Sequence, residues 1–175
     1  MAHVVFLRGV NVGGHRTFRP AQLVKELQHL GAVNIGAAGT FVIRGPVSQA
    51  ALRTELKRRL PFETEIMICP GRDIAGLLSH TCFAGHQDRP DIVRFVSVLA
   101  RTPASGPRLP ISRPESGQWL LQVVARDRRF IFGMYRRHMD AVRHLGALDK
   151  MFGMPATTRN WNTISAIAKV LQSKA

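Results

Sequence analysis

Short apolar runs alternate with segments of helical spacing in the first half of the chain. Runs rich in valine, isoleucine and phenylalanine predict strands, whereas leucines that recur every three or four residues predict helices. The predicted elements are a strand at 3–8, a helix from Pro20 that Gly31 ends, strands at 33–36 and 40–44, a helix capped by Ser48 and stopped by Pro61, and a strand at 65–69. This β-α-β-β-α-β order predicts a ferredoxin-like subdomain over residues 1–70.

The second half is less regular and predicts a smaller α+β subdomain, residues 71–175, packed on the first. Its predicted elements are a short helix at 71–79, a strand at 91–99, a hairpin of 119–125 with 129–135, and helices at 139–148 and 160–172. Thr158 or Asn160 is expected to cap the last helix. Four prolines predict a loop at 102–117. The fold class is therefore α+β.

The net charge indicates more about possible binding partners than the overall composition does. The 175 residues carry 25 Lys+Arg against 11 Asp+Glu, a formal charge of +14, and twenty of the cations are arginines. A field of that sign attracts nucleic acid, anionic metabolites or acidic proteins. A GC-rich genome would also explain the preference for arginine, although it accounts less well for the few acids.

Other features place the protein in a broad class. Two cysteines are too few for a disulfide scaffold, the first residues resemble no export signal, and no apolar run approaches about 20 residues. We therefore expect a cytoplasmic protein without a membrane segment. The sequence does not predict the oligomeric state.

Three motifs resemble one family along the whole chain. They are Leu7–Gly14 (LRGVNVGG), Ala38–Val42 (AGTFV) and Thr157–Thr163 (TTRNWNT). Together they resemble the domain of unknown function 1697 family, which implies an α+β fold with a ferredoxin-like first half and no assigned activity. This chain has Ala38-Gly39-Thr40 where the family usually has Ser-Gly-Asn, so a ligand held by that serine or asparagine in relatives could be absent here.

The glycine-rich loop is the first candidate site. Its spacing mimics a phosphate-binding loop, but His15 and Arg16 stand where lysine and a hydroxyl residue are needed, so nucleotide hydrolysis is not expected. A simpler anion site is predicted where this loop meets the last helix across a cleft between the subdomains. Its residues are Arg8, Gly9, Asn11, Gly13, Gly14, Arg159 and Asn160. The alternative is a tight turn that Asn11 fixes with side-chain hydrogen bonds.

A second candidate is an arginine-dense surface on the predicted hairpin. The predicted nucleic-acid face consists of Arg126, Arg128, Arg129, Arg136 and Arg137. The alternative is an ordinary solvated face.

Metal and catalytic chemistry have weaker support. His80, Cys82 and His86 have no common zinc spacing, and no nucleophile motif is present, so we predict no metal and no cofactor. The expected function is binding of a phosphate-bearing ligand, with nucleic acid first. An enzyme acting on a small phosphorylated or carboxylated metabolite is the alternative, and a module that binds an acidic protein is a third reading.

Overall fold

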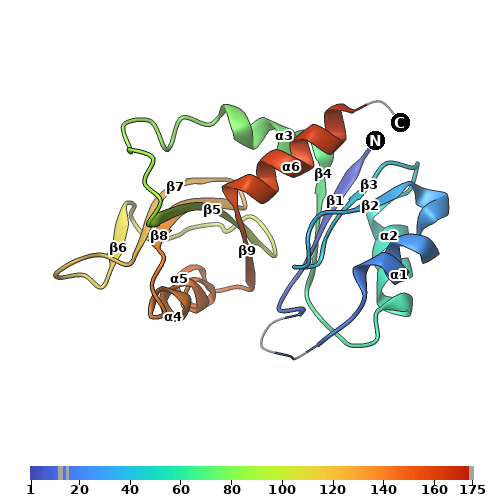
Figure 1. The fold of residues 1–175 in the computed structure, drawn as a ribbon, viewed down its shortest axis with the longest axis horizontal. Helices are drawn as coiled ribbons and strands as arrows, with labels where there is room; N and C mark the ends of the chain where they lie inside the picture. Colours follow the sequence, from blue (N-terminus) through green and yellow to red (C-terminus); the bar gives the residue numbers. More distant parts are fainter. Residues whose placement is uncertain (12–13, 15, 174–175) are drawn as a thin grey trace. The chain divides into compact units, whose positions relative to one another are not determined.

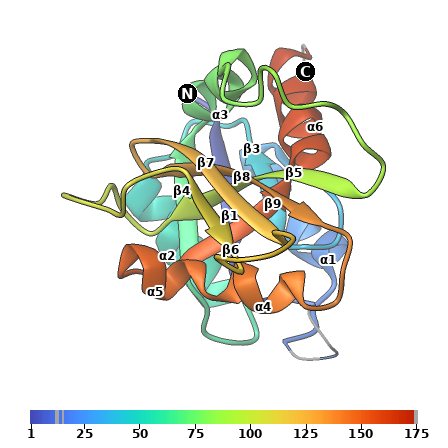
Figure 2. The ribbon, with the colours of Figure 1, turned by 90° about the vertical axis from the view of Figure 1, so that its left-hand side faces the viewer.

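The computed structural model describes every residue except 12, 13, 15, 174 and 175. Two compact units make up the chain, one of Met1–Ser79 with Asn162–Ala175 and the other of His80–Trp161. Each unit contains one antiparallel sheet with helices, so the fold is α+β (Figures 1 and 2). Among the described helices, none has the length and apolar character needed to cross a membrane.

The first unit is built on a four-stranded sheet in the order β2-β3-β1-β4, with every neighbouring pair antiparallel. Its elements are β1 (His3–Leu7), α1 (Pro20–Glu26), the 3-10 turn η1 (Gln28–Leu30), β2 (Ala32–Asn34), β3 (Thr40–Ile43), α2 (Gln49–Arg59), β4 (Ile66–Pro70), α3 (Gly71–Gly76), η2 (Leu77–Ser79) and, at the end of the chain, α6 (Trp161–Gln172). All five residues of the central strand β1 are buried, as the apolar run 4–7 predicts for its last four.

One face of this sheet is covered by α1 and α2 (Figure 1). Leu23 and Leu27 at the end of α1, and Leu52 and Leu56 on α2, pack with apolar side chains of β1, β3 and β4. The predicted Ser48 cap of α2 is confirmed, whereas α1 ends at Glu26, before the predicted end at Gly31, and η1 follows it. The Ser48 hydroxyl accepts a hydrogen bond from the Ala51 N–H (3.1 Å), and Gly31 takes the left-handed conformation after η1.

The unit boundaries differ from the expected division at residue 70, because α3 and α6 belong to the first unit. Long-range packing accounts for the difference. A Cβ at Gly71 would lie 2.8 Å from the Leu171 side chain, and the Arg44 guanidinium donates to the Val170 carbonyl (2.7 Å). These contacts join the C-terminal helix to residues far away in the sequence.

The second unit contains a five-stranded antiparallel sheet in the order β6-β7-β8-β5-β9. Its elements are β5 (Ile92–Leu99), β6 (Ile111–Arg113), β7 (Leu121–Asp127), β8 (Phe130–Arg136), α4 (Ala141–Gly146), α5 (Leu148–Phe152) and β9 (Ala156–Asn160). Leu148 and Phe152 of α5 pack on one face of the sheet with Phe95, Leu99 and Ile131.

Both edge strands of this sheet, β6 and β9, lie where the sequence does not predict a strand. The proline-rich stretch 102–117 is not wholly a loop, because Ile111–Arg113 pairs with β7. Thr158 does not cap the last helix, because it lies inside β9 opposite Ser97 and their hydroxyls share a hydrogen bond. Asn160 is the last residue of β9 and stands immediately before α6.

Candidate functional site

The loop that follows β1 lies unusually close to the turn that precedes β3. The Leu7 N–H donates to the Gly39 carbonyl (2.8 Å). A Cβ at residue 39 would lie 2.5 Å from the Val10 Cγ2 and 2.9 Å from the Leu7 Cβ, and Gly39 also has a positive φ of 73°. Only glycine satisfies both conditions, so the first two family motifs meet at a point that accepts no side chain.

Asn11 holds this loop in place with both ends of its amide. Its Nδ2 donates to the Ala37 carbonyl (3.0 Å), and its Oδ1 accepts from the Phe18 N–H (3.0 Å). Its φ of 55° lies in the left-handed region, which asparagine tolerates better than most residues. These bonds give Asn11 the turn-fixing role that was the alternative to anion binding.

Two glycines of the loop, Gly9 and Gly14, lie within the described residues. Gly9 and Gly14 have positive φ values of 63° and 76°, and both are exposed. Gly13, also predicted as an anion ligand, lies outside the described residues, as does His15.

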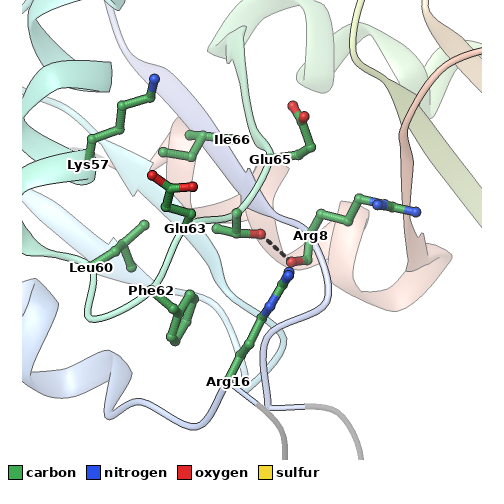
Figure 3. Close-up of a pocket in the computed structure, with 9 residues that line it drawn as sticks. Arg8, Arg16, Lys57, Leu60, Phe62, Glu63, Glu65 and Ile66 are labelled. Atoms are coloured by element: carbon green, nitrogen blue, oxygen red, sulfur yellow. Dashed lines mark hydrogen bonds between the residues drawn. The ribbon is translucent and has the colours of Figure 1, made fainter.

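The other side of the loop joins the segment that precedes β4. The Arg8 N–H donates to the Glu65 carbonyl (3.0 Å), and the Thr64 hydroxyl donates to the Arg8 carbonyl. A cavity of about 470 Å³, here called the cationic pocket, opens between this junction and the end of α2 (Figure 3). Its charged lining consists of Arg8, Arg16, Lys57, Glu63 and Glu65, and its apolar lining of Leu60, Phe62 and Ile66.

The charged groups surround the cationic pocket from separate segments. In Figure 3, Lys57 and Glu63 stand on one side, Arg16 reaches toward the Arg8 backbone, and the Arg8 guanidinium points away from Lys57. Three cations against two carboxylates leave a small positive excess. Sequence reasoning missed Lys57, whose only signal is its position one helical turn before Leu60.

A second cavity, here called the apolar hollow, lies on the same unit and has a volume of about 400 Å³. It is lined by Phe18, Arg19, Gln22, Leu23, Glu26, Arg59, Leu60 and Pro61. Leu60 lines both cavities, and the Phe18 and Phe62 rings meet edge to face with centroids 5.8 Å apart. The two cavities are therefore neighbours.

A family model for "Protein of unknown function (DUF1697)" matches residues 1–120 of this chain. The chain belongs to the DUF1697 family. The match includes the glycine loop, the Gly39 turn and the described lining of both cavities, and the family description names no activity.

Comparison with solved structures supports the fold of this DUF1697 protein. The conserved bacterial protein SP0830 from Streptococcus pneumoniae is similar with a TM-score of 0.62 and 18% identity, over 98% of each chain. No curated protein matches the sequence.

Arg159, predicted as an anion ligand, is only 6% exposed. Its Nη1 donates to the Thr157 hydroxyl (2.8 Å) and the Thr158 carbonyl (2.9 Å). Burial lowers the pKa of Arg159 to about 10. Part of its hydrogen-bonding capacity therefore serves its own strand.

The predicted anion ligands fall in both units of the DUF1697 chain. Arg159 and the exposed Asn160 belong to His80–Trp161, whereas Arg8 and Asn11 belong to the first unit. That the two groups face one cleft stays a prediction.

The predicted nucleic-acid face divides between the two ends of the β7–β8 hairpin. Arg126, Arg128 and Arg129 lie at its turn, whereas Arg136 and Arg137 lie at the far end of β8. At about 3.3 Å per residue, the six steps from Phe130 to Arg136 span about 20 Å. These arginines therefore form two groups.

Several of these arginines also have structural partners. Arg129 donates to the Leu99 carbonyl (2.8 Å) and the Ala100 carbonyl (3.1 Å), and Arg137 donates to the Pro90 carbonyl (2.9 Å). Arg126, Arg128 and Arg137 are exposed, whereas Arg129 and Arg136 are half-buried.

Arg136 is held between an aromatic ring and a carboxylate. Its guanidinium lies 4.3 Å from the Trp119 ring centroid and pairs with Asp91 (3.0 Å). The side-chain hydrogen bond from Arg89, together with the charges of Arg89 and Arg136, lowers the pKa of Asp91.

Metal and nucleophile chemistry find little support in the described part of the chain. Within it, no three His, Cys, Asp or Glu side chains lie close enough together to hold a metal ion. His80 stacks on Phe132 (4.3 Å between centroids) and accepts a hydrogen bond from the Cys82 N–H (3.2 Å). Burial raises the pKa of Cys82 to about 11, which keeps its thiol protonated at neutral pH.

The Gly39 junction predicts a difference between two glycine variants. Gly39→Ala is expected to lower the free energy of unfolding by about 3 kcal/mol or more, because the methyl group meets Val10 and Leu7 at a positive φ. Gly36→Ala is the matched control. Its φ of 67° costs about 1 kcal/mol, and no atom lies within 4 Å of the added Cβ. Chemical denaturation of both variants measures the difference, and equal losses would contradict the close approach.

The environment of Cys82 predicts a thiol that reacts slowly with alkylating reagents. A pKa raised from 9.0 to about 11 lowers the thiolate fraction at pH 7.5 about 100-fold, so alkylation by iodoacetamide is expected to be slow at that pH and to keep rising with pH until about 11. Mass spectrometry of the Cys82 peptide across pH measures this rate, with a cysteine-containing free peptide as control. A rate that levels off below pH 9 would show an activated thiolate and would favour the enzyme alternative.

Proposed function

We propose that this protein binds a phosphate-bearing ligand, nucleic acid first, in the cationic pocket. The observation that carries the proposal is that Arg8 and Arg16, from the loop after β1, and Lys57, from α2, line one cavity. Guanidinium and ammonium groups are the usual protein partners of phosphate oxygens. A volume of about 470 Å³ lies within the range of small-ligand sites.

The two carboxylates of the pocket favour a ligand that is more than a bare anion. Glu63 and Glu65 repel an isolated phosphate, but they accept hydrogen bonds from hydroxyl or amino groups. Nucleotides combine a phosphate with such donors. The charge of +14 further favours a polyanion, since it raises the local concentration of nucleic acid.

Binding is favoured over nucleophilic catalysis by the lining of the pocket. Its described residues include no histidine, cysteine or serine, and the hydroxyl of Thr64 donates to the Arg8 carbonyl. In this proposal, exposed Arg126, Arg128 and Arg137 attract the nucleic-acid backbone without reading its sequence.

Fold and location complete the proposal. A ferredoxin-like first unit is supported by the order β2-β3-β1-β4 with antiparallel neighbours and by the two helices on one face. We place the protein in the cytoplasm, where the free thiols of Cys69 and Cys82 would persist.

The salt dependence of binding tests the proposed function. Labelled single-stranded RNA and duplex DNA are titrated with the full chain and followed by fluorescence anisotropy. Affinity is expected to fall with salt, with a log–log slope of about −0.7 to −0.9 per contacted phosphate. Binding that stays negligible at low salt would contradict the proposal.

Two neighbouring cations on α2 provide the matched control. Lys57→Gln is expected to weaken binding about tenfold, because Lys57 lines the cationic pocket. Arg58→Gln removes the same charge one residue away, where the side chain is 66% exposed and pairs with Glu55. Equal losses in the two variants would assign the affinity to overall charge and would contradict a role for the pocket.

A further inference from the structure

The neighbouring cavities differ in chemistry. Most residues that line the cationic pocket are charged. The apolar hollow is lined by four apolar residues, Phe18, Leu23, Leu60 and Pro61, and by four polar ones, Arg19, Gln22, Glu26 and Arg59. Leu60 and the edge-to-face pair of Phe18 and Phe62 form the partition between them. A ligand that fills both cavities must therefore have a charged part joined, directly or through a short spacer, to a flat or apolar part.

The rim of the apolar hollow carries a connected polar group. Gln22 donates to Glu26 (3.0 Å), and the Arg59 Nε lies 3.7 Å from the other Glu26 oxygen. Amide, carboxylate and guanidinium together offer donors and acceptors at the edge of an apolar wall. A nucleobase has the complementary pattern, because its faces are apolar and its edge carries donors and acceptors.

We propose that the two cavities form one bipartite site for a single nucleotide unit, with the phosphate in the cationic pocket and the base in the apolar hollow. This inference rests on the proposed function and extends it to the class of ligand. Glu63 and Glu65 line the cationic pocket, where their carboxylates can accept hydrogen bonds from sugar hydroxyls. The unit is a free nucleotide or an unpaired nucleotide of a single strand, because a base within a duplex is stacked and cannot enter a hollow.

Paired ligands that differ only in the base test this inference on the full chain. Adenosine monophosphate and uridine monophosphate are compared with ribose 5-phosphate by isothermal titration calorimetry. Single-stranded RNA is compared by anisotropy with an abasic strand of equal length. In at least one of the two pairs, the ligand with a base is expected to bind about tenfold tighter or more. A preference within the first pair identifies a free nucleotide, and one within the second pair alone identifies a single strand.

Two α1 variants test where the base binds. Gln22→Trp fills the apolar hollow from an exposed position, so it is expected to remove the preference for the base while leaving ribose 5-phosphate or abasic-strand binding unchanged. Ala21→Trp adds the same side chain to an exposed neighbour that does not line the hollow, and it is expected to keep the preference. Circular dichroism melting checks that both variants fold.

The outcomes separate this inference from the proposed function. Equal affinity for base-bearing and base-free ligands, with the salt dependence intact, would overturn the base site and leave phosphate binding standing. A preference that survives Gln22→Trp would also overturn it. Failure of every phosphate-bearing ligand to bind at low salt would overturn both.

Discussion

The first unit depends on the close approach of two backbone segments at Gly39. No side chain fits between this residue and the Val10 and Leu7 side chains, and the Leu7–Gly39 hydrogen bond fixes the distance. Asn11 then ties the loop after β1 to the Ala37 carbonyl on one side and to the Phe18 N–H on the other. With the loop held in this way, the ends of β1 and of the loop bring Arg8 and Arg16 beside α2. The glycine-rich motif thus has a structural role first, because it fixes the path of the loop. The position of the cationic pocket follows from that path.

Arginine has two roles in this protein, and the net charge alone does not separate them. Several guanidinium groups donate to backbone carbonyls that lie far away in the sequence, as Arg44 does to Val170, Arg53 to Ile66 and Arg129 to Leu99. Such bonds connect segments that are distant in the sequence, and each is charge-assisted. Arg136 adds an aromatic contact to the same function. The arginines that serve as structural partners contribute to the electrostatic field, but they are poorly suited to follow a flexible ligand. This is why a pocket lined by few cations carries the functional proposal better than the longer list of arginines on the hairpin.

The mixed charge of the cationic pocket narrows the kind of ligand more than a purely basic pocket would. Carboxylates next to Arg8, Arg16 and Lys57 oppose a simple anion and favour a molecule with donors close to its phosphate. The apolar hollow, which shares Leu60 with the pocket, adds apolar side chains next to these charges. Family membership and the similarity to the Streptococcus pneumoniae structure establish the fold. The chemistry of the ligand is therefore inferred from these side chains.

Local patterns in the sequence by themselves determined the elements of the first unit. The apolar run of β1, the Ser48 cap and the left-handed Gly31 depend on neighbours within one turn or one strand. The polar strand β9 and the short β6 depend instead on pairing with distant strands, and the place of α6 depends on packing against Gly71. Lys57 joins Arg8 and Arg16 only because the tertiary fold brings α2 next to the loop after β1, and the β8 strand keeps Arg129 and Arg136 at opposite ends although they are close in sequence. The sequence determines strands, helix caps and turns, because these depend on near neighbours along the chain. Cavities and charged surfaces arise from contacts between distant segments, so only the tertiary structure decides them.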